Sequence, residues 1–84
     1  MEKVKLKYPV KYQGIEHQEL TMRRCKVRDR RLVGRLGGSD EEKEIRLLAN
    51  LCEVSPELIE ELDMEDYAKL QTTLMGFLGS PRMS

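Results

Sequence analysis

Hydrophobic and polar residues alternate along the first part of the chain, which predicts a β-hairpin over residues 3–23. The apolar members of the first run share one parity: Val4, Leu6, Tyr8 and Val10. They are separated mainly by lysines, the period-two pattern of a strand with one buried face. A second run follows Gly14 and carries Leu20 and Met22 on one parity. The two runs therefore predict two antiparallel strands that each bury one face.

The register of this hairpin is predicted from the requirement that both apolar stripes face the same side. With regular pairing, a two-residue turn at Gln13-Gly14 places the stripes on opposite faces. A three-residue loop over residues 12–14 pairs Leu6 with Leu20 and puts Gly14 at the left-handed position of such a loop. We therefore predict the three-residue loop.

Helical spacing after the hairpin predicts three to four short helices, so the fold class is α+β. Ser39 and Glu42 form a capping box, while Ser55 and Asp63 are predicted N-caps of two later helices. The predicted helices cover residues 26–36, 40–53, 56–62 and 64–78. We expect one domain over residues 1–79 and a flexible tail at residues 80–84.

The first of these helices carries only a weak apolar pattern. Val27, Leu32 and Leu36 are its candidate buried stripe, and Gly34 lowers the helix propensity in its middle.

The net charge of zero hides an asymmetry along the chain. Residues 1–37 hold 11 Lys and Arg against 4 Asp and Glu, whereas residues 38–84 hold 4 against 11. Opposed halves of +7 and −7 attract each other within the fold or between copies. There is neither a run of about 18 apolar residues, as a membrane helix needs, nor the apolar segment of a signal peptide at the start. We therefore expect a cytoplasmic protein with no membrane contact.

The sequence holds no group of residues that predicts catalysis or a metal site. His17 is the single histidine and has no nucleophile or acid–base partner in the pattern. Cys25 and Cys52 lack CxxC spacing, and we expect reduced, partly buried thiols. Asp63 and Asp66 are expected to serve a helix start rather than to hold a cation. We expect no enzyme activity, no metal and no cofactor.

A cluster of basic residues follows the second predicted strand. It forms a predicted basic face: Arg23, Arg24, Lys26, Arg28, Arg30 and Arg31. The alternative function is a small nucleic-acid-binding regulator that uses residues 23–31. No aromatic side chain interleaves the cluster for base stacking, and the acidic half opposes a polyanion. The sequence therefore disfavours nucleic acid as a partner.

Several short motifs occur in an order and spacing shared with one known family. They are Pro9, the Gly14 turn, Leu20-Thr21-Met22-Arg23, Arg28-Asp29, Leu48-Ala49-Asn50-Leu51, Val54-Ser55 and the stretch from Ile59 to Tyr67. Over about residues 4–78, the chain resembles the phage tail assembly chaperones of contractile-tailed phages and Mu-like prophages. Arg24-Cys25 stands where the family often has a proline, and Glu53 stands where a glycine is common.

This resemblance implies a cytoplasmic protein of the bacterial host that keeps the aggregation-prone tape measure protein soluble while the tail assembles. It also implies absence from the mature virion. Family members are commonly made in two lengths by ribosomal slippage, and Gly76-Phe77-Leu78 permits slippery codons. The expected partners are thus the tape measure protein and a frameshifted longer product of the same gene.

The last predicted helix provides the candidate protein-binding surface. Its apolar face consists of Tyr67, Leu70, Leu74, Phe77 and Leu78. We expect this face to be split between core packing and an amphipathic client helix. The exposed hairpin edge and the opposed charges also predict a homo-oligomer.

Overall fold

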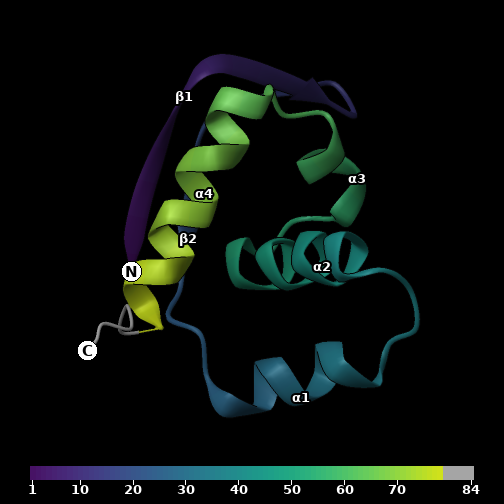
Figure 1. Cartoon of the computed structure of the whole chain (residues 1–84). Coiled ribbons are helices and arrows are strands. Elements are labelled where there is room, and N and C mark those ends of the chain that lie inside the picture. Colours follow the sequence, from purple (N-terminus) through teal and green to yellow (C-terminus); the bar gives the residue numbers. More distant parts are fainter. Residues whose placement is uncertain (79–84) are drawn as a thin grey trace.

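A computed structural model describes residues 1–78 and confirms the α+β class. An antiparallel hairpin of β1 (Glu2–Tyr12) and β2 (Ile15–Met22) precedes four helices within the described residues. These are α1 (Val27–Arg35), α2 (Asp40–Cys52), α3 (Pro56–Glu60) and α4 (Met64–Phe77). Helix α4 lies along the hairpin, α2 crosses the middle, and α1 and α3 lie on either side of α2 (Figure 1). The tail predicted for residues 80–84 lies outside the described residues.

The predicted helix starts are confirmed by their hydrogen bonds. The backbone N–H of Glu42 donates to Ser39 Oγ at 3.1 Å, and the N–H of Ser39 donates to Glu42 Oε1 at 3.1 Å. Ser55 and Asp63 likewise accept from backbone N–H groups in the first turns of α3 and α4. These bonds satisfy amides that have no partner inside the helix.

Helix α1 buries a different face from the one that the sequence predicts. Val27 and Leu32 are 79% and 51% exposed, while Asp29 and Val33 are buried. Asp29 and Val33 are four residues apart and so share a face of the helix, and α1 packs against α2. The predicted stripe is therefore wrong, because the rotation of α1 is set by the anchoring of Asp29 described below.

The hairpin turn also differs from its prediction. Tyr12 pairs with Ile15, so the loop is the two-residue turn Gln13-Gly14. Both turn residues have positive φ, 51° and 80°, as in the type I′ turn that suits the twist of a hairpin. Farther from the turn, Leu20 pairs with Val4 rather than with Leu6.

The two observations are reconciled by a bulge in β1. Lys5 pairs with Glu19 and Val10 pairs with His17, so residues 6–9 lie opposite the single residue Gln18. The bulge adds an odd number of residues to β1, which reverses the face on which its side chains lie. Both apolar stripes therefore reach the same side despite the two-residue turn. The prediction assumed uninterrupted pairing and was wrong for that reason.

Asp66 of α4 satisfies the backbone amides that the bulge frees. The N–H groups of Lys7 and Tyr8 donate to Asp66 Oδ1 and Oδ2 at 2.8 and 3.0 Å. The carboxylate is fully buried, and Lys69 Nζ lies 3.3 Å from Oδ1. Burial alone would raise the pKa of Asp66, but these bonds outweigh it and hold the pKa below its ordinary value. Asp66 is thus a long-range anchor between α4 and β1 rather than a helix cap.

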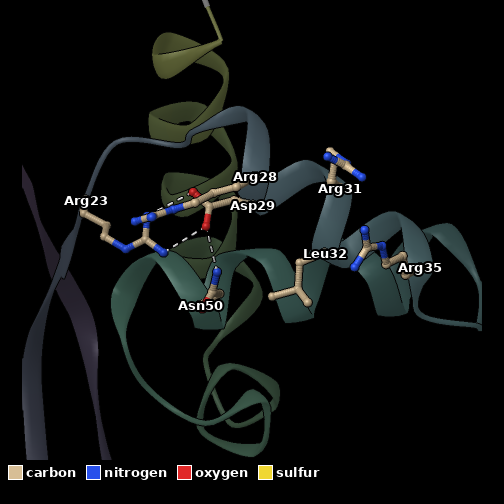
Figure 2. Close-up of a pocket in the computed structure, with 7 residues that line it drawn as sticks. All are labelled: Arg23, Arg28, Asp29, Arg31, Leu32, Arg35 and Asn50. Atoms are coloured by element: carbon tan, nitrogen blue, oxygen red, sulfur yellow. Dashed lines mark hydrogen bonds and ion pairs between the residues drawn. The ribbon is translucent and has the colours of Figure 1, made fainter.

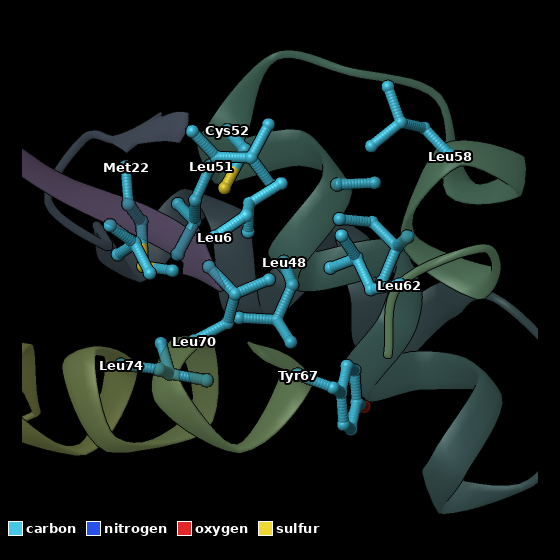
Figure 3. Packing of buried hydrophobic residues seen from close by; sticks show 14 of the residues in the cluster. Leu6, Met22, Leu48, Leu51, Cys52, Leu58, Leu62, Tyr67, Leu70 and Leu74 are labelled. Atoms are coloured by element: carbon cyan, nitrogen blue, oxygen red, sulfur yellow. The ribbon is translucent and has the colours of Figure 1, made fainter. Parts of the chain in front are cut away.

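The core lies where one face of the hairpin meets α2, α3 and α4 (Figure 3). The hairpin side chains expected there are buried, whereas Tyr8 points outward at the bulge. The helices contribute mainly leucines, and Leu48, Leu51 and Leu70 have no exposed surface. The buried residues of this cluster are Val4, Leu6, Val10, Leu20, Met22, Leu48, Ala49, Leu51, Cys52, Leu58, Ile59, Leu62, Tyr67, Leu70 and Leu74.

Candidate functional site

The predicted binding face of α4 runs from the core to the surface. Tyr67, Leu70 and Leu74 are buried and point into the cluster of Figure 3. Phe77 is half-buried and Leu78, which follows the helix, is 50% exposed. All five predicted residues belong to this region, but only its C-terminal end offers apolar surface to a partner.

A shallow depression surrounds Phe77 at this end of α4. The guanidinium carbon of Arg24 lies 5.3 Å from the centroid of the Phe77 ring, a distance that allows a cation–π interaction. Glu2, Thr73 and Gly76 complete a depression of about 320 Å³. The start of β1, the segment after β2 and the end of α4 therefore converge on one aromatic ring.

A second apolar surface was not predicted from the sequence. Five apolar side chains and two glutamates line a cavity of about 250 Å³ where α2, α3 and the start of α4 meet. We call it the glutamate groove, and it consists of Glu41, Ile45, Ile59, Glu60, Leu62, Met64 and Tyr67. Met64 is 75% exposed, although it begins a helix whose other apolar residues face mainly inward. The lining residues come from three separate elements, so no pattern along the chain indicated this surface.

The phenol of Tyr67 closes one side of the glutamate groove. Its O–H donates to Glu44 Oε1 at 2.6 Å, and Gln71 Nε2 donates to the same oxygen at 2.9 Å. Burial, followed by the neighbouring Glu44 carboxylate, raises the pKa of Tyr67. The tyrosine therefore stays neutral and holds α2 and α4 together at the edge of the groove.

The predicted basic face separates into residues with different environments. Arg23 donates from both terminal nitrogens to the Asp29 carboxylate at 3.0 Å (Figure 2). Asp29 also accepts from the backbone N–H of Lys26 at 2.8 Å and from Asn50 Nδ2 at 3.0 Å. The hydrogen bonds from Arg23, together with the bond from the backbone N–H of Lys26, outweigh the effect of burial and lower the pKa of Asp29 to about 2.

Arg23 is therefore part of an internal anchor rather than of a binding face. Arg24 covers the Phe77 ring. The remaining predicted cations, Lys26, Arg28, Arg30 and Arg31, are exposed.

An open depression of about 460 Å³ lies over this anchor, between α1 and α2. Arg28, Arg31 and Arg35 line it together with Leu32 (Figure 2). Arg35 was not among the predicted residues, although it continues the spacing of Arg28 and Arg31 along one face of the helix. We call Arg28, Arg31, Leu32 and Arg35 the arginine face.

The residues that were considered for chemistry lie apart from these surfaces. Cys52 is buried, which raises the pKa of its thiol to about 11, and Cys25 is half-buried. His17 is half-buried on β2. Among residues 1–78, no three His, Cys, Asp or Glu side chains lie close enough together to hold a metal ion. None of the helices within residues 1–78 combines the length and the hydrophobicity that a membrane span requires.

Comparison with known proteins identifies the family. Residues 3–79 match the sequence model of a family described as "Phage tail assembly chaperone proteins, E, or 41 or 14". The chain belongs to the phage tail assembly chaperones. The same comparisons found no match to a curated protein and none to a solved structure. For this chaperone, membership of the family implies that the partners are proteins of tail assembly.

Proposed function

We propose that this tail assembly chaperone binds the tape measure protein and keeps it soluble while the tail is assembled, without catalysing a reaction. The observation that carries the proposal is the gradient along α4. Leu70 is fully buried, Leu74 is 6% exposed, and Leu78 is 50% exposed, with Phe77 beside it. A long client rich in apolar segments needs such a surface on a small, highly charged carrier.

The proposed client segment is an amphipathic helix that packs on the exposed end of α4. Phe77 and Leu78 are its central contacts, and Leu70 and Leu74 belong to the core. The chaperone acts in the cytoplasm of the bacterial host and is absent from the finished virion. A longer product of the same gene, made by slippage near Gly76-Phe77-Leu78, carries a further segment for the client and binds it more tightly.

Co-expression of the chaperone with the tape measure protein tests this proposal. Phe77→Asp places a charge in the contact, and we expect the soluble fraction of the tape measure protein to fall several-fold. Thr72→Asp introduces the same charge at an exposed position of α4 away from Phe77 and leaves that fraction unchanged. Circular dichroism of both variants is the check that they remain folded. If folded Phe77→Asp protein keeps the client as soluble as before, this surface is not the site.

The two-length proposal is tested on the gene and its products. We expect a slippery heptamer at codons 76–78 and an overlapping downstream frame. Mass spectrometry of infected or induced cells should find peptides that cross from residue 76 into that frame. A gene without the heptamer and without the second frame would rule out this partner.

A further inference from the structure

Among the residues that the structure describes, no carboxylate forms an ion pair with the arginine face of α1. Arg28, Arg31, Leu32 and Arg35 have the i, i+3, i+4, i+7 spacing of one helix face and line one depression (Figure 2). Leu32 is half-exposed between the arginines. The buried carboxylate beneath them, Asp29, already accepts two bonds from Arg23. It is therefore committed to an internal partner and is not within ion-pair distance of the face.

The glutamate groove has the complementary character. Its floor is apolar, with Ile45, Ile59 and Leu62, and Glu41 and Glu60 stand at its rim. Its volume of about 250 Å³ has room for an aliphatic side chain. A smaller cavity beside it is lined by Glu42, Glu57 and Glu60 together with one cation, Arg46, so the surroundings keep an excess of negative charge. A partner that fits the groove thus carries an apolar side chain flanked by positive charges.

Within residues 1–78, neither surface is neutralised by an ion pair. Among residues 1–78, the cations that form ion pairs are Lys7, Arg23 and Lys69. The arginine face and the glutamates of the groove are outside these pairs. Within residues 1–78, the opposed charges of the two halves of the sequence are therefore left largely unpaired.

We propose that the arginine face of one copy docks into the glutamate groove of a second copy, with Leu32 as the apolar contact. The face and the groove lie on different sides of α2, because α1 packs on one side and α3 on the other (Figure 1). The contact is therefore head to tail, and each bound copy presents a new groove or a new face. Chains assemble into open oligomers or rings whose association is driven by charge and weakens as salt screens it.

A second copy fits the arginine face better than nucleic acid does. The depression contains no aromatic side chain on which a base could stack. A long polyanion would also meet the seven excess carboxylates of residues 38–84. The glutamate groove is complementary to the arginine face, because it has two carboxylates around an apolar floor.

Sedimentation velocity across a range of concentrations and salt tests the proposal with single charge reversals. Arg31→Glu alters the arginine face, and Glu60→Lys alters the groove. Their controls are the sequence neighbours Arg30→Glu and Glu61→Lys, which make the same charge changes at exposed positions outside both surfaces. At low salt we expect the wild-type chain and both controls to associate, and the two test variants to associate at least about tenfold more weakly.

Mixing the two test variants provides the decisive measurement. The glutamate introduced at position 31 of one chain then faces the lysine introduced at position 60 of the other, while the unaltered arginine face meets the unaltered groove. We expect the equimolar mixture of Arg31→Glu and Glu60→Lys to recover association. A wild-type chain that stays monomeric at all concentrations and salts overturns the proposal, as does a mixture that fails to recover.

A labelled single-stranded RNA probe separates nucleic acid from a second copy. Binding of the probe that is lost in Arg31→Glu and kept in Arg30→Glu, in a chain that does not self-associate, assigns the face to nucleic acid and overturns the proposal. Retention of wild-type sedimentation by Arg31→Glu also overturns it. These readouts do not involve the tape measure protein, so their failure leaves the proposed chaperone function intact.

Discussion

Asp29 and Asp66 are the two buried carboxylates of residues 1–78, and the chain satisfies them in opposite ways. Asp29 binds a guanidinium, a side-chain amide and one backbone N–H, all within 21 residues along the chain. Asp66 binds two backbone N–H groups that lie 58 and 59 residues away. The first carboxylate closes a local corner between β2 and α1, whereas the second joins the two ends of the fold. Two carboxylates that are buried to a similar extent can therefore stabilise very different parts of a structure.

The largest effect is expected from Asp66→Asn. An asparagine offers one acceptor oxygen to two converging amides and points an N–H toward the other, so a buried donor loses its partner. We expect the free energy of unfolding to fall by about 3 kcal/mol, a large part of the total for so small a domain. Urea denaturation followed by circular dichroism measures it. Asp63→Asn, an exposed cap, is the matched control and should change the value by less than about 0.5 kcal/mol. Equal effects at both positions would remove the special role of Asp66.

A smaller and more local effect is expected from Asp29→Asn. The substitution removes the charge that Arg23 binds, and we expect a loss of about 2 kcal/mol. Because α1 packs mainly on α2, the loss should appear as opening of α1 while the hairpin and α4 stay folded. Amide hydrogen exchange distinguishes local opening of α1 from unfolding of the whole chain. We expect exchange in the variant to be faster in α1 than in α4. Uniform acceleration over the whole chain would instead show that the corner is as essential as the Asp66 anchor.

The stability of the protein at acid pH should depend on the same two carboxylates, Asp29 and Asp66. Both have a pKa lowered by folding, so each contributes stability that is complete above the pKa of the unfolded chain and is lost as the pH falls through the folded pKa. For Asp29 that window runs from about pH 4 down to about 2, and the contribution is about 2 kcal/mol. Urea midpoints between pH 5 and 2 should fall steeply for the wild type and less steeply for Asp29→Asn. Parallel curves would contradict the lowered pKa of Asp29.

The smallest effect is expected from the cation beside Asp66. Lys69 is half-exposed and its ammonium group adds to a carboxylate that two amides already satisfy, so Lys69→Met should cost about 0.5 kcal/mol. Arg23 makes two direct bonds to Asp29, and Arg23→Met should cost about 1–2 kcal/mol. Unfolding free energies of the two variants test this order. A larger loss at Lys69 than at Arg23 would reverse it.

The candidate surfaces were predicted from the sequence only in part. The apolar face of α4 was visible as helical spacing, but the spacing does not say which end of the helix leaves the core. The glutamate groove is built from three separate elements, so its parts have no common pattern along the chain. Two residues of the arginine face, Arg28 and Arg31, were among the predicted cations. Arg23 was predicted with them, but the structure shows that it forms an internal ion pair with the buried Asp29.

The sequence by itself determined the elements and their starts. The capping bonds of Ser39, Ser55 and Asp63 join residues no more than three positions apart, and such contacts are decided by local chemistry. Alternation and helical spacing likewise identified most of the hairpin and α4 residues that reach the core, with Tyr8, Phe77 and Leu78 as the exceptions.

Only the tertiary structure decided the register of the hairpin and the rotation of α1. The bulge in β1 exists because Asp66, far along the chain, accepts the amides that regular pairing would have used. The buried face of α1 contains a carboxylate because Arg23 and Asn50 lie opposite it. A local pattern does not contain these partners, since a buried charge becomes stable only when distant donors have been brought to it by the fold.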